Sequence, residues 1–164
     1  MPLERIVYEF TVELPAPRPF AFAWATNFDS KDFERMHLRA GRAVERLADD
    51  LILLTDTFDA DPFDPRPGGR TTKVKLVHLD RTSWSWTSTH VAGPAKYSQF
   101  LYDLTARGRA RSRLRFRGAQ VEASPRPLSA AEHRRRVRQL TAQDSRLWRH
   151  LAAQMGRDQR RSAV

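Results

Sequence analysis

Hydrophobic and polar residues alternate along much of this chain, with a period of two that is typical of strands with one buried face. Residues 6–14 follow this pattern, and Pro15 ends the run. Turn sequences such as Asp49-Asp50 and Gly93-Pro94 separate the later runs. Those runs cover residues 43–48, 51–58, 71–79, 83–91, 96–105 and 109–121. Because most connections between them are short, we expect a seven-stranded antiparallel sheet, interrupted by a turn-rich loop at residues 59–69.

The segment after the first predicted strand changes to helical spacing. Phe20, Trp24 and Phe28 recur at intervals of four residues, which predicts a short helix with one apolar face. Asp29-Ser30 can cap a second short helix that extends to about Met36. The sequence therefore predicts two short helices between the first and second strands.

The chain ends with a long amphipathic helix. Ser129 and Glu132 have the spacing of a capping box, which predicts the first residues of this helix. Apolar residues then recur along one face: Val137, Leu140, Leu147, Trp148, Leu151 and Met155. The order of elements predicts an α+β fold in which the sheet surrounds this helix, while the order of the basic tail at residues 157–164 stays open.

This arrangement resembles the START-like superfamily, also called SRPBCC or Bet v 1-like, which includes polyketide cyclases/dehydrases and lipid transport proteins. The resemblance rests on the order of elements, on the segment PAPRPFAFAWATNFDSKDFERM and on the terminal helix with LWRHLAAQM. It implies one START-like domain over residues 1–164 with the helix-grip fold. It also implies an internal cavity for lipids, sterols, polyketides or other apolar molecules.

Composition narrows the classes of site. The chain of 164 residues has no cysteine, which excludes disulfides, thiol nucleophiles and cysteine-based metal sites. No metal-binding motif or nucleotide loop occurs, so we expect no metal and no cofactor. No apolar stretch is long enough to cross a bilayer and no signal peptide is expected, so we predict a cytoplasmic protein.

The net charge of +10 comes entirely from the last third of the chain. Arginine occupies every second position from Arg107 to Arg117, so a strand would present all six on one face. The favoured interpretation is a solvated face, and the alternative is a surface that binds anions. Aromatic residues for base stacking are absent from it, so we expect no specific nucleic acid as a partner. Packing of this face against a second copy, as in a homodimer, stays open.

Aromatic residues gather on the predicted concave face of the sheet and on the facing side of the long helix. Their polar ring atoms suit an oxygenated ligand that contains rings. His37 and His90 are added because both are expected near the border of the cavity. The predicted ligand-binding residues are Trp24, His37, Trp84, Trp86, His90, Phe100, Tyr102, Phe116, Trp148 and Met155.

Three residues are candidates for acid/base chemistry. His78 shares a strand face with Val74 and Leu76, which we assign to the interior, and Asp56 alternates with apolar residues on another strand. Tyr102 is the third candidate. The sequence thus favours binding of a hydrophobic small molecule such as a lipid or polyketide, for carriage or sensing. The alternative is a polyketide cyclase or aromatase-like enzyme that uses the same cavity.

Overall fold

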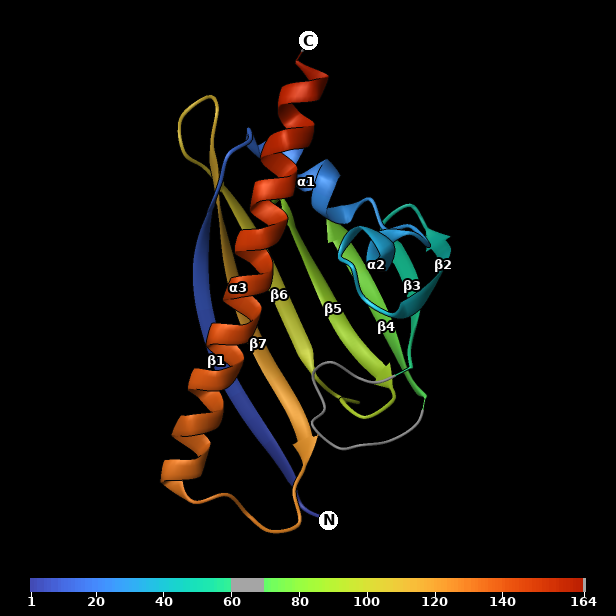
Figure 1. The fold of residues 1–164 in the computed structure, drawn as a ribbon, viewed down its shortest axis with the longest axis vertical. Coiled ribbons are helices and arrows are strands. Elements are labelled where there is room, and N and C mark those ends of the chain that lie inside the picture. The colour runs from blue at the N-terminus through green and yellow to red at the C-terminus, as the bar shows by residue number, and fades with distance from the viewer. Residues whose placement is uncertain (60–69, 164) are drawn as a thin grey trace.

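The computed structural model describes residues 1–59 and 70–163. The predicted loop at residues 59–69 therefore lies outside the described residues, apart from Asp59. The described part has the expected helix-grip architecture, with seven strands and three helices (Figure 1). The strands are β1 (Leu3–Leu14), β2 (Ala40–Ala48), β3 (Leu51–Phe58), β4 (Thr71–Asp80), β5 (Ser85–Ala92), β6 (Gln99–Ala106) and β7 (Ser112–Ala123). The helices are α1 (Arg18–Thr26), α2 (Asp32–Arg35) and α3 (Ala130–Ser162).

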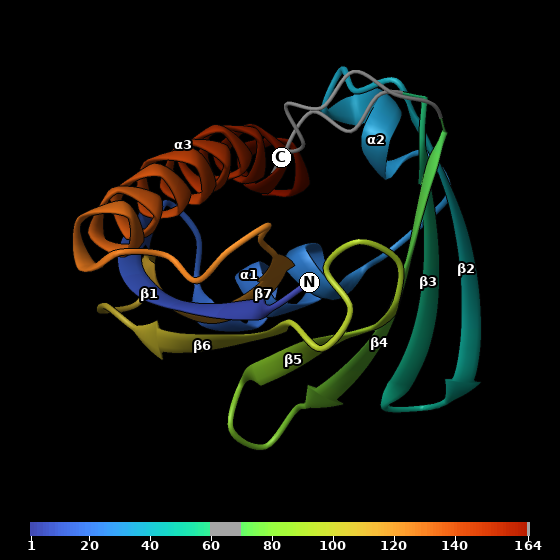
Figure 2. The ribbon, with the colours of Figure 1, turned by 90° about the horizontal axis from the view of Figure 1, so that it is seen from below.

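All seven strands form one antiparallel sheet in the order β1-β7-β6-β5-β4-β3-β2. Every strand from β2 to β7 pairs with its neighbour in the chain, and β1 joins the free side of β7. The sheet is strongly curved, with α3 lying over β1 and β7 while β2, β3 and β4 turn away from it (Figure 2). The two short helices lie at one end of this arrangement and help to position the functional site.

The long helix begins where the sequence predicts. The Ser129 side chain accepts a hydrogen bond from the backbone of Glu132, whose own side chain accepts one from the backbone of Ser129. This reciprocal capping satisfies two backbone donors of the first turn. The helix continues through Ser162, so the basic segment at residues 157–162 is helical rather than a disordered tail.

Two strands begin later than the alternation predicts. Strand β5 begins at Ser85 because residues 81–84 form a turn, in which Trp84 has a left-handed backbone conformation with a φ of 55°. Strand β7 begins at Ser112 because Gly108, with a φ of 76°, lies in the preceding turn. The predicted row of six arginines is therefore wrong in its first half, which belongs to the turn.

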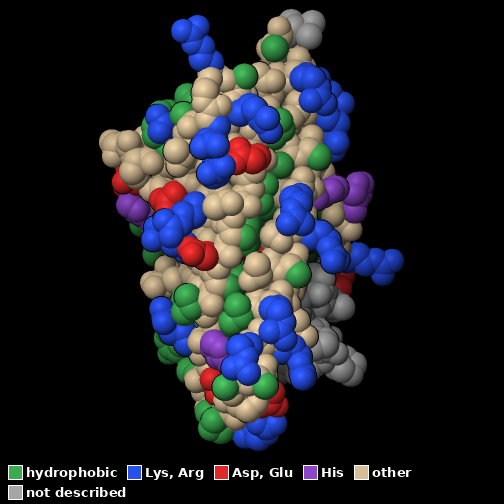
Figure 3. All heavy atoms as spheres, turned by 90° about the vertical axis from the view of Figure 1, so that its left-hand side faces the viewer, with side chains coloured by type: hydrophobic (Ala, Val, Ile, Leu, Met, Phe, Trp, Pro, Cys, Tyr) green, Lys and Arg blue, Asp and Glu red, His purple; other side chains and the backbone are tan. Residues whose placement is uncertain are grey.

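The remaining three arginines form ion pairs across the outer face of the sheet. Arg113 pairs with Glu13, Arg115 pairs with Glu9 and Arg117 pairs with Asp103. Basic side chains lie beside acidic ones on this side of the molecule (Figure 3). These pairs agree with the interpretation of a solvated face, and they leave little unpaired positive charge on the strand.

Candidate functional site

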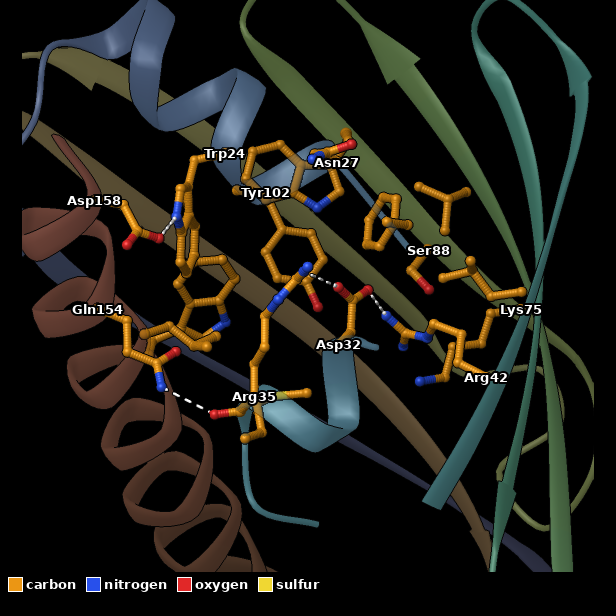
Figure 4. Close-up of a pocket in the computed structure, with 18 of the residues that line it drawn as sticks. Trp24, Asn27, Asp32, Arg35, Arg42, Lys75, Ser88, Tyr102, Gln154 and Asp158 are labelled. Carbon is orange, nitrogen blue, oxygen red and sulfur yellow. Dashed lines mark hydrogen bonds and ion pairs between the residues drawn. The ribbon is translucent and has the colours of Figure 1, made fainter. Parts of the chain in front are cut away.

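A cavity of about 710 Å³ lies between the sheet and the C-terminal part of α3. It forms on the side where the sheet curves away from the helix, and residues of α1 and α2 complete its wall (Figures 2 and 4). Pockets of this size hold small organic ligands in many proteins. The cavity is therefore the candidate functional site.

Four aromatic residues form the apolar wall of the cavity. Trp86 and Tyr102 are opposite each other in the register of β5 and β6, and their rings stack with centroids 4.9 Å apart. Trp148 of α3 lies against both rings, at 5.7 Å from Tyr102 and 6.3 Å from Trp86. Trp24 of α1 also lines the cavity, so all four were correctly grouped by the aromatic pattern.

Two hydroxyl groups face the cavity without a hydrogen-bond partner among the described residues. Ser88 is only 7% exposed, and Tyr102 is half-buried. Burial raises the pKa of Tyr102, and the negative charge of Asp144 raises it further, so the phenol remains protonated. Buried polar groups normally have partners. Both hydroxyls can therefore bind an oxygen or nitrogen atom of a ligand.

A buried charge network borders the same cavity. Asp56 is fully buried and accepts hydrogen bonds from Nε and Nη2 of Arg42, at 2.7 and 2.9 Å. The Nζ atom of Lys75 lies 2.7 Å from the same carboxylate, and Nη1 of Arg42 also binds Asp32, at 2.7 Å. Figure 4 shows Arg42, Lys75 and Asp32 on the side of the cavity formed by β2, β4 and α2.

This network keeps Asp56 ionised. Burial acts to raise the pKa of Asp56, but the hydrogen bonds and charges of Arg42 and Lys75 outweigh it and hold the pKa below its usual value. Burial lowers the pKa of Lys75, and the charge of Asp56 offsets only part of that effect. A carboxylate held by two cations is poorly suited to exchange protons with a ligand. The prediction that Asp56 is an acid/base residue is not supported.

His78 lies outside the cavity, on the opposite face of the sheet. Its side chain is 56% exposed, and its Nε2 atom lies 3.3 Å from Asp50. The inward positions of β4 are those of Lys73, Lys75 and Val77. The acid/base pair of His78 and Asp56 is therefore wrong. Strand β4 carries apolar residues on both faces and lysines on the inner one, so hydrophobicity alone assigned its faces incorrectly.

Three other predicted ligand-binding residues fill the core instead of lining the cavity. Phe116 stacks on Phe10 with centroids 4.7 Å apart and contacts Phe100 at 5.7 Å. Met155 is fully buried in the larger hydrophobic cluster. All three point inward as expected, but they lie where the helix and sheet are in direct contact.

The remaining three predicted residues also lie away from the cavity wall. His37 is exposed, and Trp84 packs against Phe22 beneath the guanidinium of Arg18. His90 is buried on the inner face with its ring against Phe100, and its Nδ1 atom has no partner among the described residues. Burial and the charges of the neighbouring lysines lower the pKa of His90 to about 3, so it is neutral at physiological pH.

The mouth of the cavity includes polar residues that the sequence analysis missed. Trp24 Nε1 donates a hydrogen bond to Asp158 at 2.9 Å, and Gln154 Nε2 donates one to the backbone oxygen of Arg35 at 3.1 Å (Figure 4). These bonds connect α1 and α2 to α3 beside the cavity. The helical spacing from Leu151 through Gln154 and Asp158 could have indicated that the same face of α3 continues beyond the apolar residues.

Residues 1–59 and 70–163 contain no group of three His, Cys, Asp or Glu side chains that could hold a metal ion. Within the same ranges, no helix has the length and apolar character needed to cross a membrane.

Comparison with solved structures identifies the fold as START-like (SRPBCC). The Zhui aromatase/cyclase from Streptomyces sp. R1128 has a TM-score of 0.70 and 13% identity, over 97% of this chain and 96% of that one. The di-domain aromatase/cyclase StfQ of the steffimycin pathway has a TM-score of 0.73 and 12% identity, over 98% and 52%. A START superfamily protein from Mycobacterium smegmatis has a TM-score of 0.68 and 10% identity, over 92% and 97%. No family model and no curated protein sequence matches the chain.

Proposed function

We propose that this protein binds an apolar small molecule that contains rings and at least one oxygen atom. The observation that carries the proposal is the cavity of about 710 Å³, whose aromatic wall includes two unpartnered hydroxyls. The stacked Trp86 and Tyr102 provide flat apolar surface, and the hydroxyls of Tyr102 and Ser88 provide polar contacts. Carriage or sensing of such a molecule requires only this binding step.

A cyclase or aromatase-like activity is the second candidate. Two of the structural neighbours are aromatase/cyclases, and the Tyr102 hydroxyl can donate a proton to a ligand oxygen within the cavity. Such enzymes gain rate by holding a reactive chain in one conformation, with few groups for proton transfer. Turnover of a linear polyketide that Tyr102→Phe abolishes would favour this candidate. Binding without turnover would favour the carrier.

The binding proposal is tested by filling the cavity without disturbing the core. Ala25 and Ala23 both lie on α1, but Ala25 lines the cavity whereas Ala23 is exposed. We expect Ala25→Phe to weaken binding of the apolar fluorescent probe N-phenyl-1-naphthylamine by about tenfold or more, since one ring displaces ligand volume worth more than 1.4 kcal/mol. Ala23→Phe should leave binding unchanged, with circular dichroism confirming that both variants are folded.

The proposal fails if the purified protein binds no apolar probe, or if both variants bind it as the unmodified protein does. Native mass spectrometry of freshly purified protein gives an independent measurement, because a retained ligand would appear as a defined mass increment.

A further inference from the structure

Positive charge is in excess around the cavity. Five basic residues line it, against two acidic ones. The basic residues are Arg35, Arg42, Lys75, Arg157 and Arg161, and the acidic residues are Asp32 and Asp158. A cavity with low-dielectric walls strengthens the field of such an excess, and so attracts anions.

The inner cations and the cations at the mouth differ in how they are compensated. Arg42 and Lys75 both bind the buried Asp56, and Arg42 also binds Asp32. An additional anion beside them would meet two carboxylates and would lose its hydration. The inner part of the cavity therefore suits an uncharged polar group.

At the mouth, positive charge is left without a strong partner. Arg157 forms no ion pair with any described residue, and Nη1 of Arg161 is 3.9 Å from Asp158, at the limit of an ion pair. Asp158 is already engaged through its other carboxylate oxygen by the indole of Trp24. Arg157 and Arg161 are four residues apart on α3, so their side chains lie on the same face of the helix.

Building on the proposed function, we propose that the ligand is an anion whose rings occupy the cavity and whose acid group remains at the mouth, beside Arg157 and Arg161. The acid group can be a carboxylate, sulfate or phosphate, since each pairs with guanidinium groups. It keeps part of its hydration there, while the buried Ser88 and Tyr102 bind a neutral oxygen at the other end. The proposal thus defines an amphipathic ligand with one charged end.

Two fluorescent probes test the charge separately from the apolar body. 8-Anilino-1-naphthalenesulfonate and N-phenyl-1-naphthylamine share the same rings, and only the first carries a sulfonate. We expect the sulfonate probe to bind more tightly and to be displaced by the neutral one. Arg157→Gln and Arg161→Gln together should weaken sulfonate binding by about four- to twentyfold, about two- to fivefold for each exposed arginine. Binding of the neutral probe should change less than twofold.

Arg160→Gln is the matched control, because Arg160 lies in the same helical turn but does not line the cavity. It should leave the affinity for the sulfonate probe unchanged. Equal losses in the control and the double variant would overturn the proposal in favour of general surface attraction. Equal binding of both probes, unaffected by the arginines, would overturn the anionic ligand while retaining the cavity. Absence of binding by either probe would overturn the proposed function as well.

Discussion

The inner face of the sheet has two halves that use aromatic residues in opposite ways. In the filled half, β1 and β7 lie against the N-terminal part of α3, and the rings of Tyr8, Phe10, Phe100 and Phe116 pack together. In the open half, β3, β4 and β5 curve away from α3, and Trp86 and Tyr102 border a cavity. The same residue types therefore form core in one half and a ligand wall in the other.

Polar groups show the same contrast. In the filled half, Tyr8 donates a hydrogen bond to the buried Asp144, so each polar group has a partner. Burial raises the pKa of Asp144, while the hydrogen bond from Tyr8 opposes this effect. In the open half, the hydroxyls of Ser88 and Tyr102 lack partners and only the charge network is fully paired. Pairing within the protein thus distinguishes the structural polar groups from those available to a ligand.

The largest expected effect tests whether the charge network maintains the open half. Arg42→Met leaves Asp56 buried without its bidentate partner, and such a loss costs about 3–5 kcal/mol in the free energy of unfolding. Arg46→Met on the same strand removes an exposed side chain and should cost less than about 0.5 kcal/mol. Urea denaturation measures both variants. Similar values for the two would show that packing, rather than the network, supports the wall of the cavity.

The fold could be predicted because its signals are local. The capping box at Ser129 and the alternation in the strands depend on neighbours in the chain, and the structure agrees with both. The inward position of Asp56 was also predicted, because β3 alternates strictly between buried and half-buried residues. These features do not require knowledge of how far the sheet curves.

The site was only partly predictable because it depends on that curvature. Trp86 and Phe116 both face inward, but only the distance of the sheet from α3 decides which of them meets a cavity. The alternation of β4 failed because the inward Lys75 is stabilised by Asp56, a partner on another strand. Pairings of this kind between distant residues are invisible to a pattern along one strand.

An intermediate effect tests how tightly the filled half is packed. A Cβ atom added at Gly118 would lie 2.9 Å from the Phe116 ring and 3.0 Å from the Tyr8 ring, with no room for either to move freely. Gly118→Ala should therefore cost about 1–3 kcal/mol of stability. At Gly41, in the outermost strand of the open half, no atom lies within 4 Å of such a Cβ. Gly41→Ala should stabilise by up to about 1 kcal/mol through the unfolded chain.

Thermal or urea unfolding of these two alanine variants would reveal whether the filled half tolerates extra volume. A Gly118→Ala protein as stable as the unmodified one would mean that the aromatic cluster can rearrange. The distinction between a filled and an open half would then be weaker than the ring contacts indicate.

The smallest effect concerns the charged outer surface of the filled half. Arg115 forms an exposed ion pair with Glu9, so Arg115→Gln should change the free energy of unfolding by less than about 1 kcal/mol. It should also leave the binding of the sulfonate probe unchanged, in contrast to the arginines at the mouth of the cavity.

The paired arginines of β7 also predict that this surface binds no nucleic acid specifically. Binding to duplex DNA depends on neutralised phosphates, with a slope of about −0.9 per contact against the logarithm of salt concentration. Arginines already paired with carboxylates can release few counterions, so any complex should dissociate below about 0.15 M salt. A gel-shift complex that survives this salt concentration, and disappears when Arg111, Arg113 and Arg115 become glutamine, would contradict the prediction. That result would mean that the ion pairs on this face open to bind phosphates, and that the two halves of the molecule do not differ in the availability of their arginines.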